Sequence, residues 1–281
     1  LREGNPALAK EVYDRGLEIL TPLQKSPSPP SILPLLHANI LALRAPLQKD
    51  PKQKENDIQK ALELLERVDL SLQGTSNEIL IRATLRSMES PPEEGLRNTI
   101  DYLEENEREN PANPFLYIAK ADHLQELASW EQTQGGNPRP HLRQAYQAIQ
   151  TALDLSPITH KLFESEIRLA SRIFLMGSLP RKGIENHQET LSRIISILSE
   201  QEPDSPRISQ AKALIHLLET TLLKRRREDA TVHYEQAIEL LKEHPENPDT
   251  LALLAEGWFQ FGLARHALGE NPTFQFGKAL E

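Results

Sequence analysis

The chain has 281 residues, a formal net charge of −9 and no cysteine. The acidic balance argues against a general nucleic-acid-binding protein, because such proteins need a basic surface to displace counterions from phosphates. A chain without cysteine has no disulfide, no thiolate nucleophile and no cysteine-ligated zinc. Aromatic residues make up only 5% of a chain rich in Leu, Ala, Glu, Gln, Lys and Arg, which are strong helix formers. We therefore predict an all-α protein.

The first predicted helix covers residues 5–25, where apolar residues such as Val12 and Leu17 recur at helical spacing. A Ser-Pro-Ser-Pro-Pro run follows and ends this helix, because proline lacks the N–H that a helix interior needs. We assign 1–29 to an N-terminal helix with a proline-rich linker and 30–281 to an array of helix pairs.

Six helix pairs are predicted after the linker, and most of the 21 prolines fall between them. The first helices of the pairs are expected at 30–47, 75–89, 113–134, 158–177, 205–225 and 248–268. The second helices are expected at 56–70, 92–110, 139–155, 182–201, 229–243 and 272–281. Start signals include Ser76 or Asn77 before Glu78, Ser90 before a Pro-Pro pair, and Asn247 before Pro248.

The stretch 145–157 has the clearest packing pattern in the chain. Its apolar and small positions are Ala145, Ile149, Ala152, Leu153 and Leu155, closed by Pro157. They predict a buried seam with small residues at two positions, where a neighbouring helix comes close. The central small position recurs at Ala61, Ala152, Ala237 and Ala279. Leu103 and Ile195 complete a period of about 42 residues, and one longer interval contains an insertion at 133–140.

This two-helix unit resembles the tetratricopeptide repeat over roughly 30–281. The match is carried by the seam at 145–157, by Ala230, Tyr234, Ala237, Ile238 and Leu240, and by Leu251, Leu254, Ala255, Trp258, Gly262 and Ala267. The resemblance implies a right-handed superhelix (solenoid) of about six helix pairs, whose first helices line a concave, peptide-binding surface. The period exceeds the usual one of about 34 residues, and armadillo or HEAT repeats are the structural alternative. The last seam stops before its expected proline, so we expect the array to be truncated at 281.

Catalytic signatures are missing from the sequence: it has no phosphate-binding Gly-rich loop, no G-x-S-x-G turn and no H-E-x-x-H helix. We expect no enzyme activity in this segment and no cofactor. His123 with Glu126, and His216 with Glu219, each place two metal-ligand types on one helix face. Two ligands make a poor site, and the two pairs fall in different repeats, so we expect no metal.

Two further clusters have simple structural interpretations. Trp258 falls at a core position of the repeat, whereas Phe259 or Phe261 is a candidate to face a partner or a following repeat. The basic run 224–227 stands where a helix ends, and cations there stabilise the negative end of the helix dipole. A phosphate or nucleic-acid patch is the alternative for this run.

Basic residues at helical spacing on the first helices are the candidate partner-binding site. They are Arg82, Arg86, Lys120, His123, Lys161, Arg168, Arg172, Lys212 and His216. Basic residues slightly outnumber acidic ones over the six first helices, although the whole chain carries −9. Such a surface would suit an acidic segment or a C-terminal carboxylate. The alternative is that these cations pair with carboxylates of adjacent helices or simply face water.

We therefore expect a protein-interaction scaffold that binds a peptide or protein segment on the first-helix face. An acidic segment is one such ligand. The alternative is a sensor or regulatory arm of a larger signalling enzyme whose catalytic part lies outside this segment. RNA binding by helical repeats is disfavoured by the acidic balance. No apolar run approaches the ~20 residues of a membrane helix, so no membrane insertion is expected. The lack of cysteine suits a bacterial cytoplasm, which we favour, or a periplasm.

Overall fold

The computed structural model of the protein divides into two compact units, 1–155 and 156–281, which are described separately. It describes residues 6–24, 30–69, 71–88, 91–156, 160–176, 181–202, 205–243 and 248–280. Over these ranges all regular structure is helical, with thirteen α-helices and one 3-10 helix. The all-α class predicted from the sequence is therefore confirmed, and helices pack against their neighbours in chain order, as in a solenoid.

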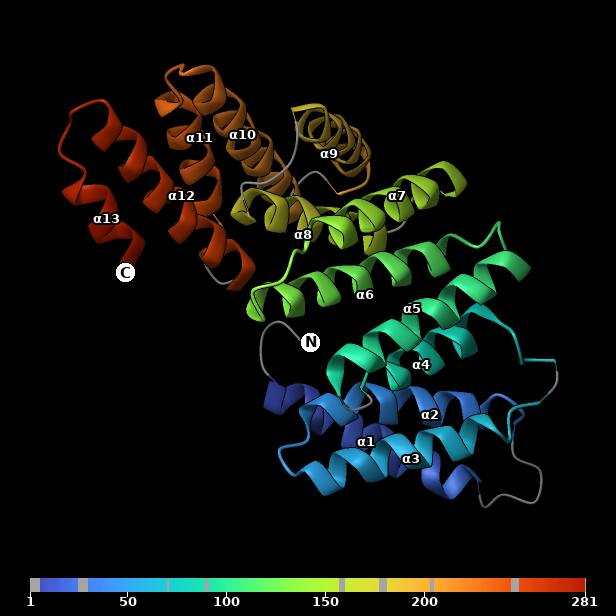
Figure 1. The fold of residues 1–281 in the computed structure, drawn as a ribbon. Helices are drawn as coiled ribbons and strands as arrows, with labels where there is room; N and C mark the ends of the chain where they lie inside the picture. The colour runs from blue at the N-terminus through green and yellow to red at the C-terminus, as the bar shows by residue number, and fades with distance from the viewer. Residues whose placement is uncertain are drawn as a thin grey trace. The chain divides into compact units, whose positions relative to one another are not determined.

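The first unit contains seven of these α-helices (Figure 1). They are α1 (Pro6–Gln24), α2 (Leu33–Arg44), α3 (Pro51–Leu65), α4 (Ser76–Arg86), α5 (Pro92–Glu109), α6 (Pro114–Thr133) and α7 (Arg139–Leu155), and the 3-10 helix η1 (Ala45–Leu47) follows α2. Each helix packs on the next one along the chain, and α4 also contacts both α2 and α6. The first helices α2, α4 and α6 thus pack side by side, and each second helix packs on the first helix that precedes it.

The second unit contains the other six described helices (Figure 1). They are α8 (His160–Met176), α9 (Arg181–Gln201), α10 (Pro206–Arg226), α11 (Thr231–Lys242), α12 (Pro248–Ala267) and α13 (Thr273–Leu280). Together with the first unit they reproduce the predicted N-terminal helix and six pairs. None of the described helices is long and apolar enough to cross a bilayer.

The largest difference in helix boundaries concerns α3, which begins at Pro51 rather than at the predicted residue 56. Asp50 caps it: its carboxylate accepts a hydrogen bond of 3.0 Å from the backbone N–H of Lys52, and proline occupies the first helical position. The Asp-Pro pair is the local signal that locates this start. By contrast, α7 spans the predicted residues 139–155. The predicted signals at Ser90, Pro157 and Asn247 lie outside the described residues.

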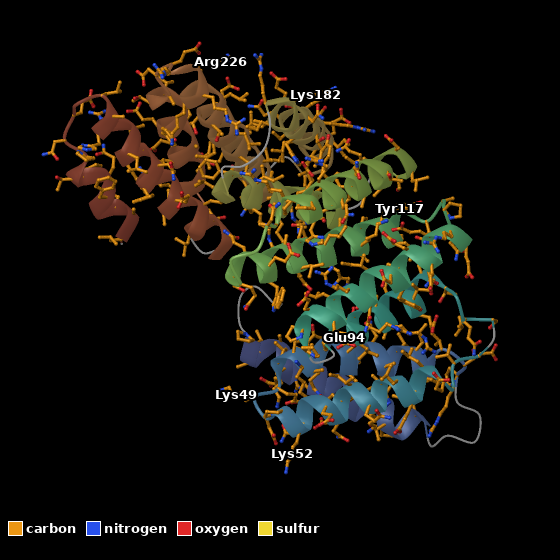
Figure 2. The ribbon with its side chains drawn as sticks, in the orientation of Figure 1. Lys49, Lys52, Glu94, Tyr117, Lys182 and Arg226 are labelled. Atoms are coloured by element: carbon orange, nitrogen blue, oxygen red, sulfur yellow. The ribbon has the colours of Figure 1, made fainter. Side chains whose placement is uncertain are left out.

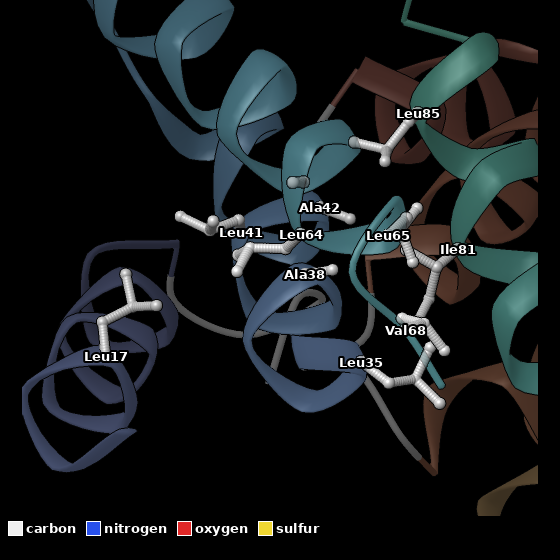
Figure 3. Packing of buried hydrophobic residues seen from close by; sticks show 11 residues of the cluster. Leu17, Leu35, Ala38, Leu41, Ala42, Leu64, Leu65, Val68, Ile81 and Leu85 are labelled. Carbon is white, nitrogen blue, oxygen red and sulfur yellow. The ribbon is translucent and has the colours of Figure 1, made fainter. Parts of the chain in front are cut away.

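The core of the first unit begins where α1 to α4 meet (Figure 3). The buried residues gathered there are Leu17 from α1, Leu35, Ala38, Leu41 and Ala42 from α2, Ala61, Leu64 and Leu65 from α3, Val68 after it, and Ile81 and Leu85 from α4. Small and large side chains alternate along α2, so the alanines leave room for the leucines of the facing helices. The predicted small seat at Ala61 is fully buried in this cluster.

The predicted seam of α7 is buried at Ala145, Ile149, Ala152 and Leu153. The prediction was wrong for Leu155, which is exposed because it is the last residue of the helix and points beyond the packed face. In α9 Ile194 is fully buried together with Leu191 and Leu198, whereas Ile195, the predicted seat, is half-buried. The predicted seat in this helix is therefore wrong by one residue.

Helix α10 packs against α8, α9 and α11. Its buried residues cover about two-thirds of its circumference at 3.6 residues per turn, which is wider than the apolar stripe of a surface helix. Gly257 of α12 lies beside both α10 and α11, because a Cβ there would be in ordinary van der Waals contact, at 3.8 Å, with side-chain atoms of Leu217 and Ile238. Since α8 and α12 contact each other as well, the first helices of this unit pack together around α10.

Candidate functional site

The predicted cation Arg82 is neutralised within the first unit. Its guanidinium forms an ion pair with Glu78 one turn earlier in α4 and a second one, at 3.2 Å, with Glu66 after α3. Burial opposes the charged form, but the hydrogen bonds and charges of the two glutamates raise the pKa of Arg82 above its ordinary value. Arg82 thus links two helices, as the alternative interpretation of the basic residues requires.

Lys120 of α6 is neutralised in the same way. Its Nζ lies 2.5 Å from Glu107 Oε2 and 3.8 Å from Glu104 Oε1, both on α5. Burial raises the pKa of the Glu107 carboxyl, and the Lys120 ammonium offsets that effect only in part. The ammonium also lies 5.8 Å from the centre of the Tyr117 ring, which is labelled in Figure 2.

The two remaining candidates of the first unit also have partners. The Arg86 guanidinium lies over the ring of Tyr102, 4.6 Å from its centre, in a cation–π contact between α4 and α5. His123 Nδ1 is 3.3 Å from Glu126 Oε2, so the predicted His-x2-Glu pair does form on one face of α6. Around all four candidates of this unit, acidic or aromatic groups of the protein occupy positions that a ligand would otherwise take.

A further cation that the site prediction did not include joins three helices. Arg44, at the end of α2, donates from Nε to Asp57 Oδ2 at 2.9 Å and from Nη2 to Asp57 Oδ1 at 2.5 Å. Its Nη1 donates to Asp14 of α1 at 2.7 Å, and Gln48 donates to Asp57 at 2.8 Å. Burial opposes the charge, but the bonds to the two aspartates raise the pKa of Arg44. Asp57 is buried in α3, and no spacing in the sequence distinguishes it from the exposed polar residues around it.

The candidates of the second unit lie on α8 and α10. Arg168 and Arg172 are half-buried one turn apart on α8, and each interacts with other groups of the chain. Lys212 is exposed on α10. The side chain of Lys161 falls outside the described residues.

His216 meets a second histidine instead of a metal-binding carboxylate. Its Nδ1 lies 3.1 Å from Nδ1 of His233 on α11, and the ring centres are 5.4 Å apart. At this distance one ring donates its N–H to the other. Burial, and then the neighbouring His233, lowers the pKa of His216. Where the structure is described, no three His, Asp or Glu side chains are grouped to hold a metal.

A buried pair of ionisable groups in the second unit was not anticipated from the sequence. His187 of α9 lies with its Nδ1 2.7 Å from Glu166 Oε1 of α8, and both side chains are buried. The residues are separated by 21 positions, so no local motif announces them. The pair links α8 and α9.

The aromatic residues near the C-terminus include both buried and exposed side chains. Trp258 is buried, as predicted, and stacks on buried Phe261 with ring centres 6.2 Å apart. Phe259 is exposed and lies 5.8 Å from the ring of Phe276 on α13. Gly262 allows this arrangement, because a Cβ at that position would clash with the Phe276 ring at 2.5 Å. Of the two candidates to face a partner, only Phe259 is accessible.

The basic run stands at the C-terminal end of α10, where the sequence predicted that a helix ends. Arg227 adopts a left-handed conformation, with φ of 60°, and the N–H of Glu228 donates to Leu223 C=O at 2.9 Å. Lys224 donates to Gln260 of α12 at 2.8 Å. The left-handed residue and the long-range backbone bond close the helix end in a Schellman-type turn.

Comparisons with known proteins do not add an assignment. No protein-family model matches the chain, and no curated protein matches it.

Proposed function

We propose that the protein is a protein-interaction scaffold of the tetratricopeptide-like type, which binds a peptide or protein segment on the face of its first helices. The observation that carries the proposal is on α12, a first helix, where Phe259 and Leu263 stand exposed one turn apart. Large apolar side chains at this spacing are typical anchors for a partner. Exposed Lys212 on α10 supports an acidic segment as the ligand.

The resemblance to tetratricopeptide repeats is supported by packing as well as by spacing. Ala145, Ile149 and Ala152 are all fully buried, so the small positions do lie where a neighbouring helix approaches. A preformed array of helices is also suited to binding, because it is ordered before the partner arrives and avoids that part of the entropic cost.

The test is affinity purification with mass spectrometry from the native source, using the complete chain as bait. Joint replacement of Arg168 and Arg172 by glutamate should remove the captured partners that bind through an acidic segment. Replacement of Arg181 and Lys182 by glutamate makes the same change of charge on the second helix α9 (Figure 2) and should leave capture unchanged. Circular dichroism and the melting temperature show whether each variant is folded.

Phe259→Asp tests the apolar anchor in the same experiment. If neither Phe259→Asp nor the double arginine variant reduces capture, and both are folded, the first-helix face is not the binding surface. If the α9 control loses the partners equally, binding depends on total charge rather than on these helices.

A further inference from the structure

Helix α1 carries two apolar faces, and only one of them is covered. Leu17 and the residues around it pack into the core of the first unit. A second row, Leu8, Val12, Ile19 and Leu23, lies about 120–180° round the helix from Leu17 at 3.6 residues per turn, and remains between 42% and 66% exposed. Rows at this spacing run along one side of a helix. The row is about 22 Å long, at 1.5 Å per residue, which is four helical turns of uncovered apolar surface.

Helix α2 extends this surface. A Cβ on Gly16 of α1 would lie 2.9 Å from Cδ1 of Ile40, so the two helices touch there. Asp14 of α1 pairs with Arg44, four residues after Ile40, so the two helices are antiparallel. Leu36 is one turn before Ile40 and exposed, so it lies near Ile19 and Leu23 of the α1 row. Ile32 precedes Leu36 by a further turn and is also exposed. We call the exposed residues Leu8, Val12, Ile19 and Leu23 of α1, Leu36 of α2 and Ile32, which caps α2, together with Gly16 and Ile40 between them, the α1–α2 apolar face.

The size of the α1–α2 apolar face bears on what covers it. About half of the surface of six large aliphatic side chains amounts to roughly 500 Å², comparable with the largest apolar patches on monomeric proteins, which are often functional. A stable dimer needs about 800 Å² from each partner. The face is therefore large enough to bind one added helix, but it is smaller than the area that a stable dimer needs.

One charge lies within the face. Arg15 is exposed between Val12 and Ile19 on the same side of α1, and it forms no ion pair with any residue that the structure describes. Glu11 and Glu18 are also exposed and are the i−4 and i+3 neighbours of Arg15, but they lie on the side of Arg15 that is turned away from the apolar row. A ligand that covers the row must therefore accommodate a guanidinium near its middle, and a carboxylate does so best.

The position of Arg15 disfavours a second copy of this chain. The row is symmetric about its centre, so antiparallel self-pairing would place Leu8 against Leu23 and Val12 against Ile19 of the second copy. The two Arg15 side chains would then meet at the symmetry axis. Like charges facing each other in a partly dehydrated contact oppose association.

We propose that the α1–α2 apolar face binds an amphipathic helix of another protein, with apolar residues along one side and a carboxylate opposite Arg15. This surface contains none of the residues of α8, α10 and α12 that the proposed function uses. Binding would use the helix-packing mode, in which residues at i, i+4, i+7 and i+11 of the ligand interdigitate with the exposed row.

The probe is a fluorescein-labelled helix of about five turns, built from Leu, Ala and Gln, with leucines at i, i+4, i+7 and i+11. Two versions differ only in a central Glu or Lys. Anisotropy measured with the complete chain should show that the Glu peptide binds about fivefold more tightly than the Lys peptide. This is the effect expected when an exposed ion pair between Arg15 and the peptide Glu is replaced by repulsion between Arg15 and the peptide Lys. Arg15→Glu should reverse this order, which a nonspecific apolar surface would not do.

Ile19→Asp should weaken both peptides at least tenfold, because it places a charge at the most exposed position of the row. Val232→Asp on α11 is the matched control, since Val232 is 60% exposed but lies in the other unit. Equal binding of the two peptides, an Arg15→Glu variant that keeps the original order, or no binding of either peptide overturns the proposal. A dimer in light scattering that Ile19→Asp dissociates would assign the face to a second copy instead.

Discussion

Asp57→Ala tests whether the link between α1, α2 and α3 stabilises the first unit. The change removes the acceptor of two hydrogen bonds from Arg44 and one from Gln48. Breaking a buried ion pair by removing one partner costs about 3–5 kcal/mol. Arg44 keeps its bond to Asp14, and its side chain is 19% exposed, so the lower end applies. We expect a loss of about 3 kcal/mol, which for a unit of this size lowers Tm by roughly 6–12 °C.

The assay exploits the two tryptophans, since one lies in each unit. In a Trp258→Phe background, fluorescence reports on Trp130 of α6 and so follows urea unfolding of the first unit alone. Asp101→Ala is the control: it removes an exposed aspartate of α5 and should change stability by no more than about 0.5 kcal/mol. A loss below about 1 kcal/mol for Asp57→Ala would refute the argument.

A compensating variant separates the lost charge pair from lost packing. Joint replacement of Arg44 by Met and Asp57 by Leu removes both charges and keeps apolar volume, so it should recover most of the stability. If the double variant is as unstable as Asp57→Ala, the aspartate acts through packing and not through the ion pair.

Three further predictions concern stability. Ala152→Leu should overpack the fully buried seam of α7 and cost about 1–3 kcal/mol in urea unfolding; an unchanged midpoint would contradict the close helix approach. Arg227→Gly should stabilise the second unit by about 0.5–1 kcal/mol, because glycine adopts the observed φ of 60° without strain, and a lower Tm would count against it. Burial, then the charges of Lys60 and Arg44, lower the pKa of His37. Below about pH 6.5 the unfolded chain therefore binds more protons than the folded chain, so the free energy of unfolding should fall as the pH drops towards the lowered pKa. In His37→Gln, the free energy of unfolding measured in urea should change less between about pH 7 and pH 5. An unaltered pH dependence would exclude His37 as the cause of the fall.

Local chemistry explains why most helices could be located from the sequence. Proline and capping residues act within one or two positions, so α7 was predicted at its observed limits. The seam of α9 was misplaced by one residue because Ile194 and Ile195 are chemically identical. Only the rotation of the helix against its neighbours, a tertiary property, decides which isoleucine is buried.

The candidate site was harder to predict, because the state of a cation depends on a different helix. Arg82 meets Glu66 across 16 residues, and Lys120 meets Glu107 across 13. Counting charges along one helix cannot identify such partners. The sequence can show that first helices are relatively basic, but the facing carboxylates decide how much of that charge is available to a ligand.

The contact between α8 and α12 has a consequence for how this protein can evolve. Solenoids commonly gain or lose whole repeats, because each repeat contacts only its neighbours. In the second unit the last helix pair also covers α10 and reaches back to α8. Deleting that pair would uncover Leu217 and its neighbours instead of simply shortening an array. Changes in repeat number are therefore constrained here, and the unit is expected to be inherited as a whole.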